Sequence, residues 1–456
     1  MGWLHKYKNK ILDYSLFITS LLLPLILALY NGFPFYFYDT TAYIYTGFTN
    51  EILPFRPMGY GHIINIFKIF DSLWAIVIFQ SIVASYLVFL FLKIFIQKNL
   101  YKIHFFIILS LLLLTSFGWF ANFLMPDIFI GLGALSILII FFEKKGWQNQ
   151  IIPSFLLFVS SYVHTSHPPI LLASSLIILI IANIVNKEYR QKNNIRAVII
   201  IAIIILAFGA IKLSNREYNY TYNQAAPAFL IGRLEEIGIL DDFLKKNCQN
   251  YNYQLCDLLP NFKKTRTEGF LWQKDAPINI IGWNESSGEY KLITRQVLSQ
   301  PNYLFQFFFA GLKSGLNSFH LLALDPFGPH YTNRYEDYYY TIIQYFPGDK
   351  ISLDSSRQFN NTNYLQKNMA NLISLSFVIS LVYILYLLFK RKLKNQEYII
   401  VISIMILIAI NNFMTATFST ISCSRYSNRI SWLLPLMALI LIVRRYFYQV
   451  PGKVKK

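Results

Sequence analysis

The first long apolar run of the chain, ILDYSLFITSLLLPLILALY at Ile11–Tyr30, decides its class. An α-helix needs roughly 20 mostly apolar residues to cross the hydrocarbon core of a bilayer, and this run supplies them. Nine further apolar runs follow it, so the sequence predicts an all-α polytopic membrane protein with about ten transmembrane helices. The predicted spans are about 11–30, 73–96, 103–122, 127–143, 151–166, 168–185, 197–213, 369–389, 397–414 and 429–446.

The composition agrees with a membrane protein. Of the 456 residues, 55% are hydrophobic and only 14% are charged, whereas a soluble domain carries roughly a quarter charged residues. The net charge of +18 does not indicate nucleic-acid binding, because the Lys and Arg residues gather in short links between apolar runs rather than on a soluble module. We therefore expect membrane lipid, and no nucleic acid, among the partners.

Basic residues predict the orientation. The links at 144–145, 187–196 and 390–394 and the C-terminal tail are rich in Lys and Arg. With ten spans, all of them fall on one face, which the positive-inside rule assigns to the cytoplasm. We expect a multi-pass protein of the cytoplasmic (inner) membrane with both termini cytoplasmic.

Three parts follow from this topology: an N-terminal membrane half at 1–213, which carries a first outer loop at 31–72, an extracytoplasmic segment at 214–368, and a C-terminal membrane part at 369–456. The middle segment reads as mostly helical, with a mixed fold as the alternative. Residues 304–324 are apolar but contain Lys313, so we expect an amphipathic helix at the outer interface, with a re-entrant helix as the alternative. Cys248 and Cys256 form a disulfide if that side is oxidising, or remain buried thiols.

Unusual polar residues gather at the predicted outer edge of the bundle. Polar and ionisable groups near a membrane are costly unless they have partners or a function. The unusual polar residues at this edge come from five separate segments, and their convergence is the strongest functional signal in the sequence. The candidate catalytic residues are Asp39 and Asp127, and the candidate substrate-binding residues are Arg56, Tyr60, His62, His164, His167, Arg425 and Arg429.

Asp39 lies in the first outer loop, nine residues past the first span. An ionised carboxylate there can take a proton from a hydroxyl nucleophile, and Arg56 can hold a phosphate bidentately. The simpler alternative is that Asp39 opens an interfacial helix. Asp127 can likewise be a cap at the start of the fourth span.

The first outer loop resembles that of the GT-C superfamily, the multi-span glycosyltransferases that use lipid-phosphate-linked sugars. The resemblance rests on the early Asp39 followed by Tyr43, on Arg56-Pro57-Met58-Gly59-Tyr60, and on the short Met125–Asp127 loop. Protein O-mannosyltransferases and the aminoarabinose transferase of lipid A are the most similar in layout. The chain departs from them at Thr40, where many members have a second acidic residue, and at Met58, where many have proline.

The resemblance implies an inverting transferase that moves a sugar from a polyprenyl-phosphate donor to an envelope lipid, glycan or protein on the outer face. It implies that Asp39 is the general base and that Arg56, Arg425 and Arg429 stand near the leaving phosphate. The alternative for these arginines is snorkelling to the interface.

His164 and His167 are three residues apart, which predicts that both lie on one helix face. With Asp39 or Asp127 they can bind a divalent metal, although two histidines alone are a weak signal. The alternatives are a polar contact to the donor and a hydrogen-bonded helix end. For the whole chain, the rival functions are a transporter or flippase for lipid-linked sugars, an O-antigen polymerase or ligase, and a non-catalytic assembly protein.

Overall fold

The structure of the chain, a computed structural model, describes residues 2–143, 146–219, 221–258, 267–320, 322–328, 335–418 and 424–447. Helices dominate these ranges, and they contain isolated bridges but no strand. The predicted all-α class is therefore confirmed for the described part of the chain.

Seven helical segments are long and apolar enough to cross a membrane, judged by length and composition over the described residues. They indicate a membrane-embedded protein, and each coincides with a predicted span. The segments are α1 (Gly2–Leu22) with η1 (Leu23–Leu25) and α2 (Ile26–Asn31), α5 (Trp74–Leu92), α10 (His167–Val185), η3 (Lys187–Tyr189) with α11 (Arg190–Ser214), α21 (Leu365–Phe389), α22 (Asn395–Phe418), and α23 (Ser424–Ser431) with α24 (Leu433–Phe447).

The other three predicted spans are shorter helices. They are α6 (Leu100–Leu114), α8 (Asp127–Phe142) and α9 (Gln148–Tyr162). Every residue of α8 is buried, which explains why its sequence is apolar all round rather than amphipathic. The helix α8 therefore lies in the interior of the bundle, where α5, α9 and α23 pack on it.

The predicted continuous span at 103–122 is wrong, because the chain breaks in the middle of it. The helix α6 ends at Leu114, Thr115 is extended, and a short buried helix α7 (Phe117–Ala121) follows. The Asn122 side chain donates hydrogen bonds to the carbonyl oxygens of Pro24 (2.6 Å) and Gly118 (2.7 Å). A side-chain amide that satisfies backbone acceptors in this way makes an irregular chain tolerable inside an apolar core.

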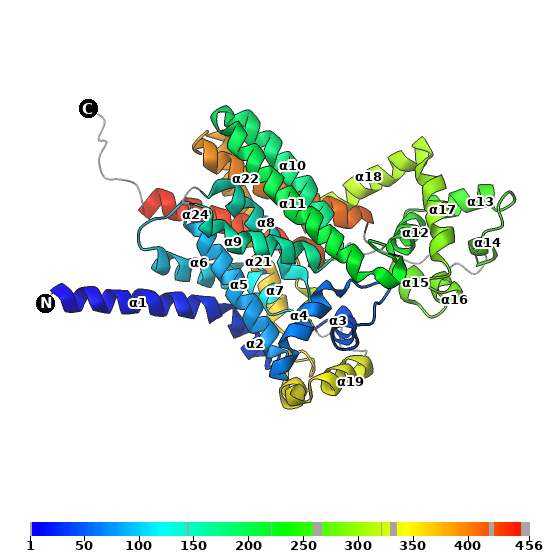
Figure 1. The fold of residues 1–456 in the computed structure, drawn as a ribbon, viewed down its shortest axis with the longest axis horizontal. Coiled ribbons are helices and arrows are strands. Elements are labelled where there is room, and N and C mark those ends of the chain that lie inside the picture. The colour runs from blue at the N-terminus through cyan, green and yellow to red at the C-terminus, as the bar shows by residue number, and fades with distance from the viewer. Residues whose placement is uncertain are drawn as a thin grey trace.

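A second group of helices forms its own hydrophobic cluster beside the bundle (Figure 1). We call this group, residues 226–317, the helical cap. It consists of α12 (Ala226–Glu236), α13 (Ile239–Asn247), α14 (Gln254–Leu258), α15 (Thr267–Trp272), α16 (Pro277–Ile281), α17 (Ser287–Leu298) and α18 (Pro301–Asn317).

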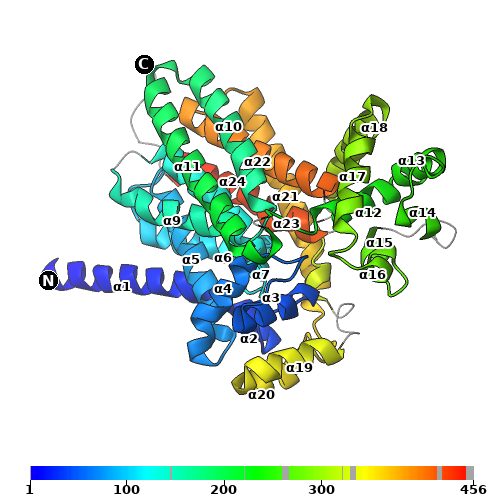
Figure 2. The same cartoon turned by 45° about the vertical axis from the view of Figure 1, so that its right-hand side comes forward.

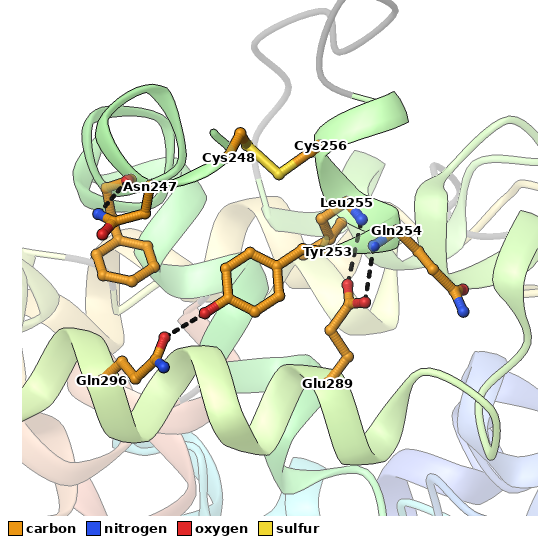
Figure 3. The surroundings of a disulfide bond; sticks show 9 residues. Asn247, Cys248, Tyr253, Gln254, Leu255, Cys256, Glu289 and Gln296 are labelled. Atoms are coloured by element: carbon orange, nitrogen blue, oxygen red, sulfur yellow. Dashed lines mark hydrogen bonds between the residues drawn. A yellow bond between two sulfur atoms is a disulfide. The ribbon is translucent and has the colours of Figure 1, made fainter. Parts of the chain in front are cut away.

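A disulfide joins Cys248 and Cys256 in the cap (Figure 3). Beside it, the Glu289 carboxylate of α17 accepts hydrogen bonds from the backbone N–H groups of Gln254 (2.8 Å) and Leu255 (3.1 Å). This carboxylate satisfies donors at the start of α14 that the helix itself leaves unpaired. The disulfide closes the loop between α13 and α14, and the Glu289 carboxylate ties the start of α14 to α17.

The rest of the segment at 214–368 packs on the bundle instead of the cap. Leu324, Ile342 and Leu353 belong to the main hydrophobic cluster. These residues come from the short elements η7 (Asp325–Phe327), α19 (Tyr335–Tyr345), η9 (Pro347–Asp349) and α20 (Lys350–Ser355) and from their flanks. The Asp349 carboxylate accepts hydrogen bonds from the Ser72 hydroxyl (2.6 Å) and the Leu73 N–H (2.7 Å) just before α5. One sequence segment therefore contributes to two separate cores.

The helix α18 joins the cap to the bundle by packing on α22. It ends at Asn317, so the predicted amphipathic helix at 304–324 is shorter than expected. One face of α18 is buried against α22, while Phe305, Phe309 and Leu316 on another face are exposed. Gly311 allows the close approach, because a Cβ there would lie 2.2 Å from the Thr417 hydroxyl oxygen.

Replacing Gly311 with valine is expected to destabilise the protein by about 1–3 kcal/mol, because the added side chain overpacks this contact. Gly288→Ala in α17 is the matched control, since nothing lies within 4 Å of a Cβ at that position. Thermal unfolding in detergent measures both variants. Equal melting temperatures for Gly311→Val and wild type would show that α18 does not pack on α22 this closely.

Candidate functional site

Asp39 lies in the first turn of α3 (Tyr38–Thr49), a short helix beside the bundle. Thr40 anchors this turn: its hydroxyl oxygen accepts a hydrogen bond from the Phe37 N–H (2.9 Å), and its hydroxyl donates to the Leu124 carbonyl (3.2 Å). The loop before α3 is thereby tied to the loop before α8, which carries Asp127. Figure 2 shows α3 and α23 on the side of the bundle that faces the helical cap.

Two arginines contact the Asp39 carboxylate, one on each oxygen. Arg56 forms an ion pair with Oδ1, and Nη1 of Arg425 lies 3.3 Å from Oδ2. The three side chains are largely buried, between 6% and 15% exposed. Two of them come from the first loop and the third lies almost 400 residues later in the sequence, so the fold brings these predicted site residues together.

Asp127 forms the second half of the ion cluster. It is the first residue of α8, and its Oδ1 lies 3.4 Å from Nε of Arg425 and 3.8 Å from Nη1 of Arg429. Both arginines belong to α23, where their spacing of four residues puts them on neighbouring turns of one helix side. Arg425 therefore bridges the two carboxylates, and its position is set by the packing of α23 on α8.

Aromatic rings and an asparagine hold the arginines in place. The Arg425 guanidinium carbon lies 4.8 Å from the ring centres of both Phe37 and Tyr426. Arg429 donates hydrogen bonds through Nε (3.3 Å) and Nη2 (3.0 Å) to the side-chain oxygen of Asn411 in α22. Such contacts fix guanidinium groups away from water, so snorkelling to the interface does not describe these two arginines.

The cluster of Asp39, Asp127, Arg56, Arg425 and Arg429, which we call the ion cluster, carries three positive and two negative charges. Burial raises the pKa of Asp39, but the neighbouring Arg56 and Arg425 outweigh it and hold the pKa below the usual value of 3.8. Asp39 is therefore ionised at neutral pH. Three guanidinium groups held at one largely buried place can bind an anionic ligand.

The histidines are arranged differently from the prediction. His164 lies in the turn before α10 and His167 begins α10, so they do not share a helix face, although their rings stack with centres 5.1 Å apart. Nδ1 of His164 accepts a hydrogen bond from the Ser166 N–H (3.1 Å). Burial and the nearby Arg429, Arg56 and Arg425 lower the pKa of His164 well below 6.5, so its ring is neutral at pH 7.

His167 is fully buried, and its Nδ1 donates to the Ser160 carbonyl (2.7 Å). This bond agrees with the alternative of a hydrogen-bonded helix end. In the described part of the chain, no three His, Cys, Asp or Glu side chains gather closely enough to hold a metal ion. The structure thus gives no described third ligand to the histidine pair.

Tyr60 and His62 belong to α4 (Met58–Phe67) and support the site from outside the ion cluster. Tyr60 is fully buried and donates a hydrogen bond to Oε1 of Gln80 (2.8 Å). Nδ1 of His62 and the Tyr162 hydroxyl form a hydrogen bond (2.6 Å). Gly59 lets α4 approach this region, because a Cβ there would lie 2.3 Å from the Tyr162 carbonyl oxygen. The glycine of the Arg-Pro-x-Gly-Tyr motif is thus needed for packing.

Sequence reasoning assigned no site role to several residues that touch the ion cluster, although Trp272 stood out in the outer segment as a residue that can contact an acceptor. Phe37 and Tyr426 stack on Arg425, Asn411 holds Arg429, and Trp272 of the cap lies over Arg56 with its ring centre 5.7 Å from the guanidinium carbon. Asn411 also carried a signal, since the Asn411-Asn412 pair is unusual inside an apolar span.

Comparisons of the chain with protein-family models, with curated proteins and with solved structures found no match. The chemistry of the site must therefore be argued from its own residues.

Proposed function

We propose that the protein is an inverting membrane glycosyltransferase that moves a sugar from a polyprenyl-phosphate donor to an envelope acceptor on the outer face of the membrane. The observation that carries the proposal is the buried ion cluster, in which three arginines converge on two carboxylates. A leaving phosphate needs such preorganised positive charge near it.

The acceptor hydroxyl attacks C1 of the donor sugar from the face opposite the phosphate. A new C1–O bond forms, the bond from C1 to the phosphate oxygen breaks, and its electron pair leaves with the polyprenyl phosphate. Asp39 takes the proton of the attacking hydroxyl. The atoms and charges balance without any further reactant.

The ion pairs give Asp39 two states in this scheme. With both oxygens held by Arg56 and Arg425, it is a weak base. A donor phosphate offers these arginines a stronger bidentate partner. When either guanidinium turns to the phosphate, one Asp39 oxygen becomes available and its pKa rises toward the usual value. Donor binding would thus switch on the base.

The layout supports the predicted topology of ten spans with both termini cytoplasmic and the cap outside. The N-terminal end of α1 and the C-terminal end of α24 lie at the end of the bundle opposite the helical cap (Figure 1). The disulfide in the cap fits an oxidising compartment on that side. The ion cluster then belongs at the outer face, where polyprenyl-phosphate sugars are presented.

The test is release of polyprenyl phosphate by the purified protein in nanodiscs, measured over a panel of polyprenyl-phosphate sugars with and without EDTA. Release from at least one donor is expected. Activity that survives EDTA assigns the chemistry to the side chains alone. If no donor releases its phosphate, the transporter and assembly alternatives take the place of the transferase.

A further inference from the structure

An aromatic cluster connects the helical cap to the loop that carries Arg56. Phe55 lies against Trp272 and Trp283, with ring centres 5.7 and 5.3 Å away, and the two tryptophan rings are 5.3 Å apart. Phe229 of α12 also contacts both tryptophans, with ring centres 6.5 and 6.3 Å away. Through Trp272, which also lies over Arg56, this cluster reaches the ion cluster.

A cleft runs beside the cluster, between the first loop and the chain that follows α11. It is lined by Phe55, Arg56, Thr165, Tyr222, Asn223 and Gln224, among others. All six side chains are partly exposed, as are Trp272 and Trp283. The cleft therefore brings the Phe55 and Tyr222 rings, two side-chain amides and the partly exposed Arg56 together at one place.

Holding the cap in position does not require this arrangement. The packing of α18 on α22 already joins the cap to the bundle, through the buried glycine contacts of Gly311 and Gly315. Two tryptophans that served only as a further contact would be better fully buried, because the stabilisation scales with the apolar area removed from water. Partly exposed aromatic rings with a few convergent polar groups are typical of a ligand site.

We propose that this junction is the acceptor site and that its ligand is a carbohydrate, an inference that rests on the transferase proposed above. The C–H groups on one face of a pyranose ring pack on the electron-rich face of an indole. The amides of Asn223 and Gln224 can donate to and accept from sugar hydroxyls. Neither feature suits a lipid tail, which needs no amides.

The position of the cleft suits the transfer step. Arg56 lines the cleft and also pairs with Asp39. A sugar that contacts Arg56 in the cleft therefore lies next to the side chain that pairs with the proposed base. In this arrangement the cleft beside the cap binds the acceptor and the ion cluster binds the donor phosphate. Arg56 belongs to the ion cluster and also lines the cleft.

The experiment measures binding of four fluorescently labelled linear tetrasaccharides, of glucose, galactose, mannose and N-acetylglucosamine, to the full-length protein in nanodiscs. At least one is expected to bind. Trp272→Ala and Trp283→Ala are each expected to weaken that binding about tenfold or more. Trp272→Phe and Trp283→Phe, which keep an aromatic face, should restore most of it. Trp147→Ala is the control. Trp147 is exposed and lies just before α9, in the link that follows α8, whereas Asp127 of the ion cluster begins α8.

Donor-only release of polyprenyl phosphate is measured in the Trp283 variants and should not change, since water replaces the acceptor and no described contact joins Trp283 to the ion cluster. If wild type releases the lipid phosphate but binds none of the tetrasaccharides, the carbohydrate site is wrong and the transferase stands. The same conclusion follows if both tryptophan-to-alanine variants bind like wild type. If a tetrasaccharide binds through the tryptophans but no donor is turned over, the carbohydrate site stands and the transferase is wrong.

Discussion

Replacing Arg425 with alanine is expected to lower the rate of polyprenyl-phosphate release by about 10²–10³-fold, the usual effect of removing one donor to a developing anion. Arg425 is the residue that touches both carboxylates, with Nη1 3.3 Å from Asp39 and Nε 3.4 Å from Asp127. Its loss removes positive charge where the phosphate would leave and also frees an Asp39 oxygen prematurely. Turnover and donor affinity are measured for variant and wild type.

Arg425→Lys is expected to recover little of this activity. An ammonium is a single point charge, whereas the planar guanidinium offers separate N–H groups to two partners. Arg444→Gln is the matched control, because Arg444 pairs with Glu397 at the far end of the bundle. If Arg425→Ala turned over within about threefold of wild type, Arg425 would not stabilise the leaving phosphate in the way proposed.

The second large effect is expected on stability. Asp127→Asn removes a buried carboxylate, 3% exposed, from between Arg425 and Arg429, which are 6% and 1% exposed. The cluster then holds three positive charges against one negative charge. Breaking a buried ion pair from one side costs about 3–5 kcal/mol, because the remaining charge is left uncompensated away from water. Thermal and denaturant unfolding in nanodiscs measure the change.

Glu397→Gln provides the comparison for this loss. Glu397 is 7% exposed, but its partner Arg444 is 28% exposed and can turn to water, so the expected destabilisation is smaller. Addition of excess polyprenyl phosphate should raise the melting temperature of Asp127→Asn, because a bound anion replaces the missing negative charge. An Asp127→Asn protein as stable as wild type would show that Asp127 does not balance the two arginines.

The apolar pattern predicts much of this fold. Runs such as Ile11–Tyr30 have no stable alternative to a long helix, because lipid leaves backbone groups no other partner. The pattern also predicts that Asp39, Asp127, Arg425 and Arg429 lie near one end of the bundle. Each lies in or beside a link that follows an odd-numbered predicted span, and all such links fall on the same membrane face. The ion pairs between them are consistent with that reasoning, although spacing alone did not indicate which carboxylate pairs with which arginine.

The remaining features depend on contacts between distant segments. The break at Thr115 is stabilised by the Asn122 side chain, which bonds to Pro24 nearly 100 residues earlier, and hydropathy cannot detect such a bond. The histidine pair was misplaced because His164 lies in a turn before α10 begins. The contacts of Trp272 with the edge of Phe55 and with Arg56 join residues more than 200 positions apart, which no local periodicity predicts.

The central claim is that Asp39 is the general base of a transferase, and the most direct test compares wild type with Asp39→Asn. Donor binding and polyprenyl-phosphate release are measured for both, with Asp241→Asn, in an exposed pair with Lys245 of the cap, as control. The account predicts that Asp39→Asn binds donor but releases its phosphate at least about 10²-fold more slowly, while Asp241→Asn matches wild type. Full activity in Asp39→Asn would contradict the account and move the base to another residue.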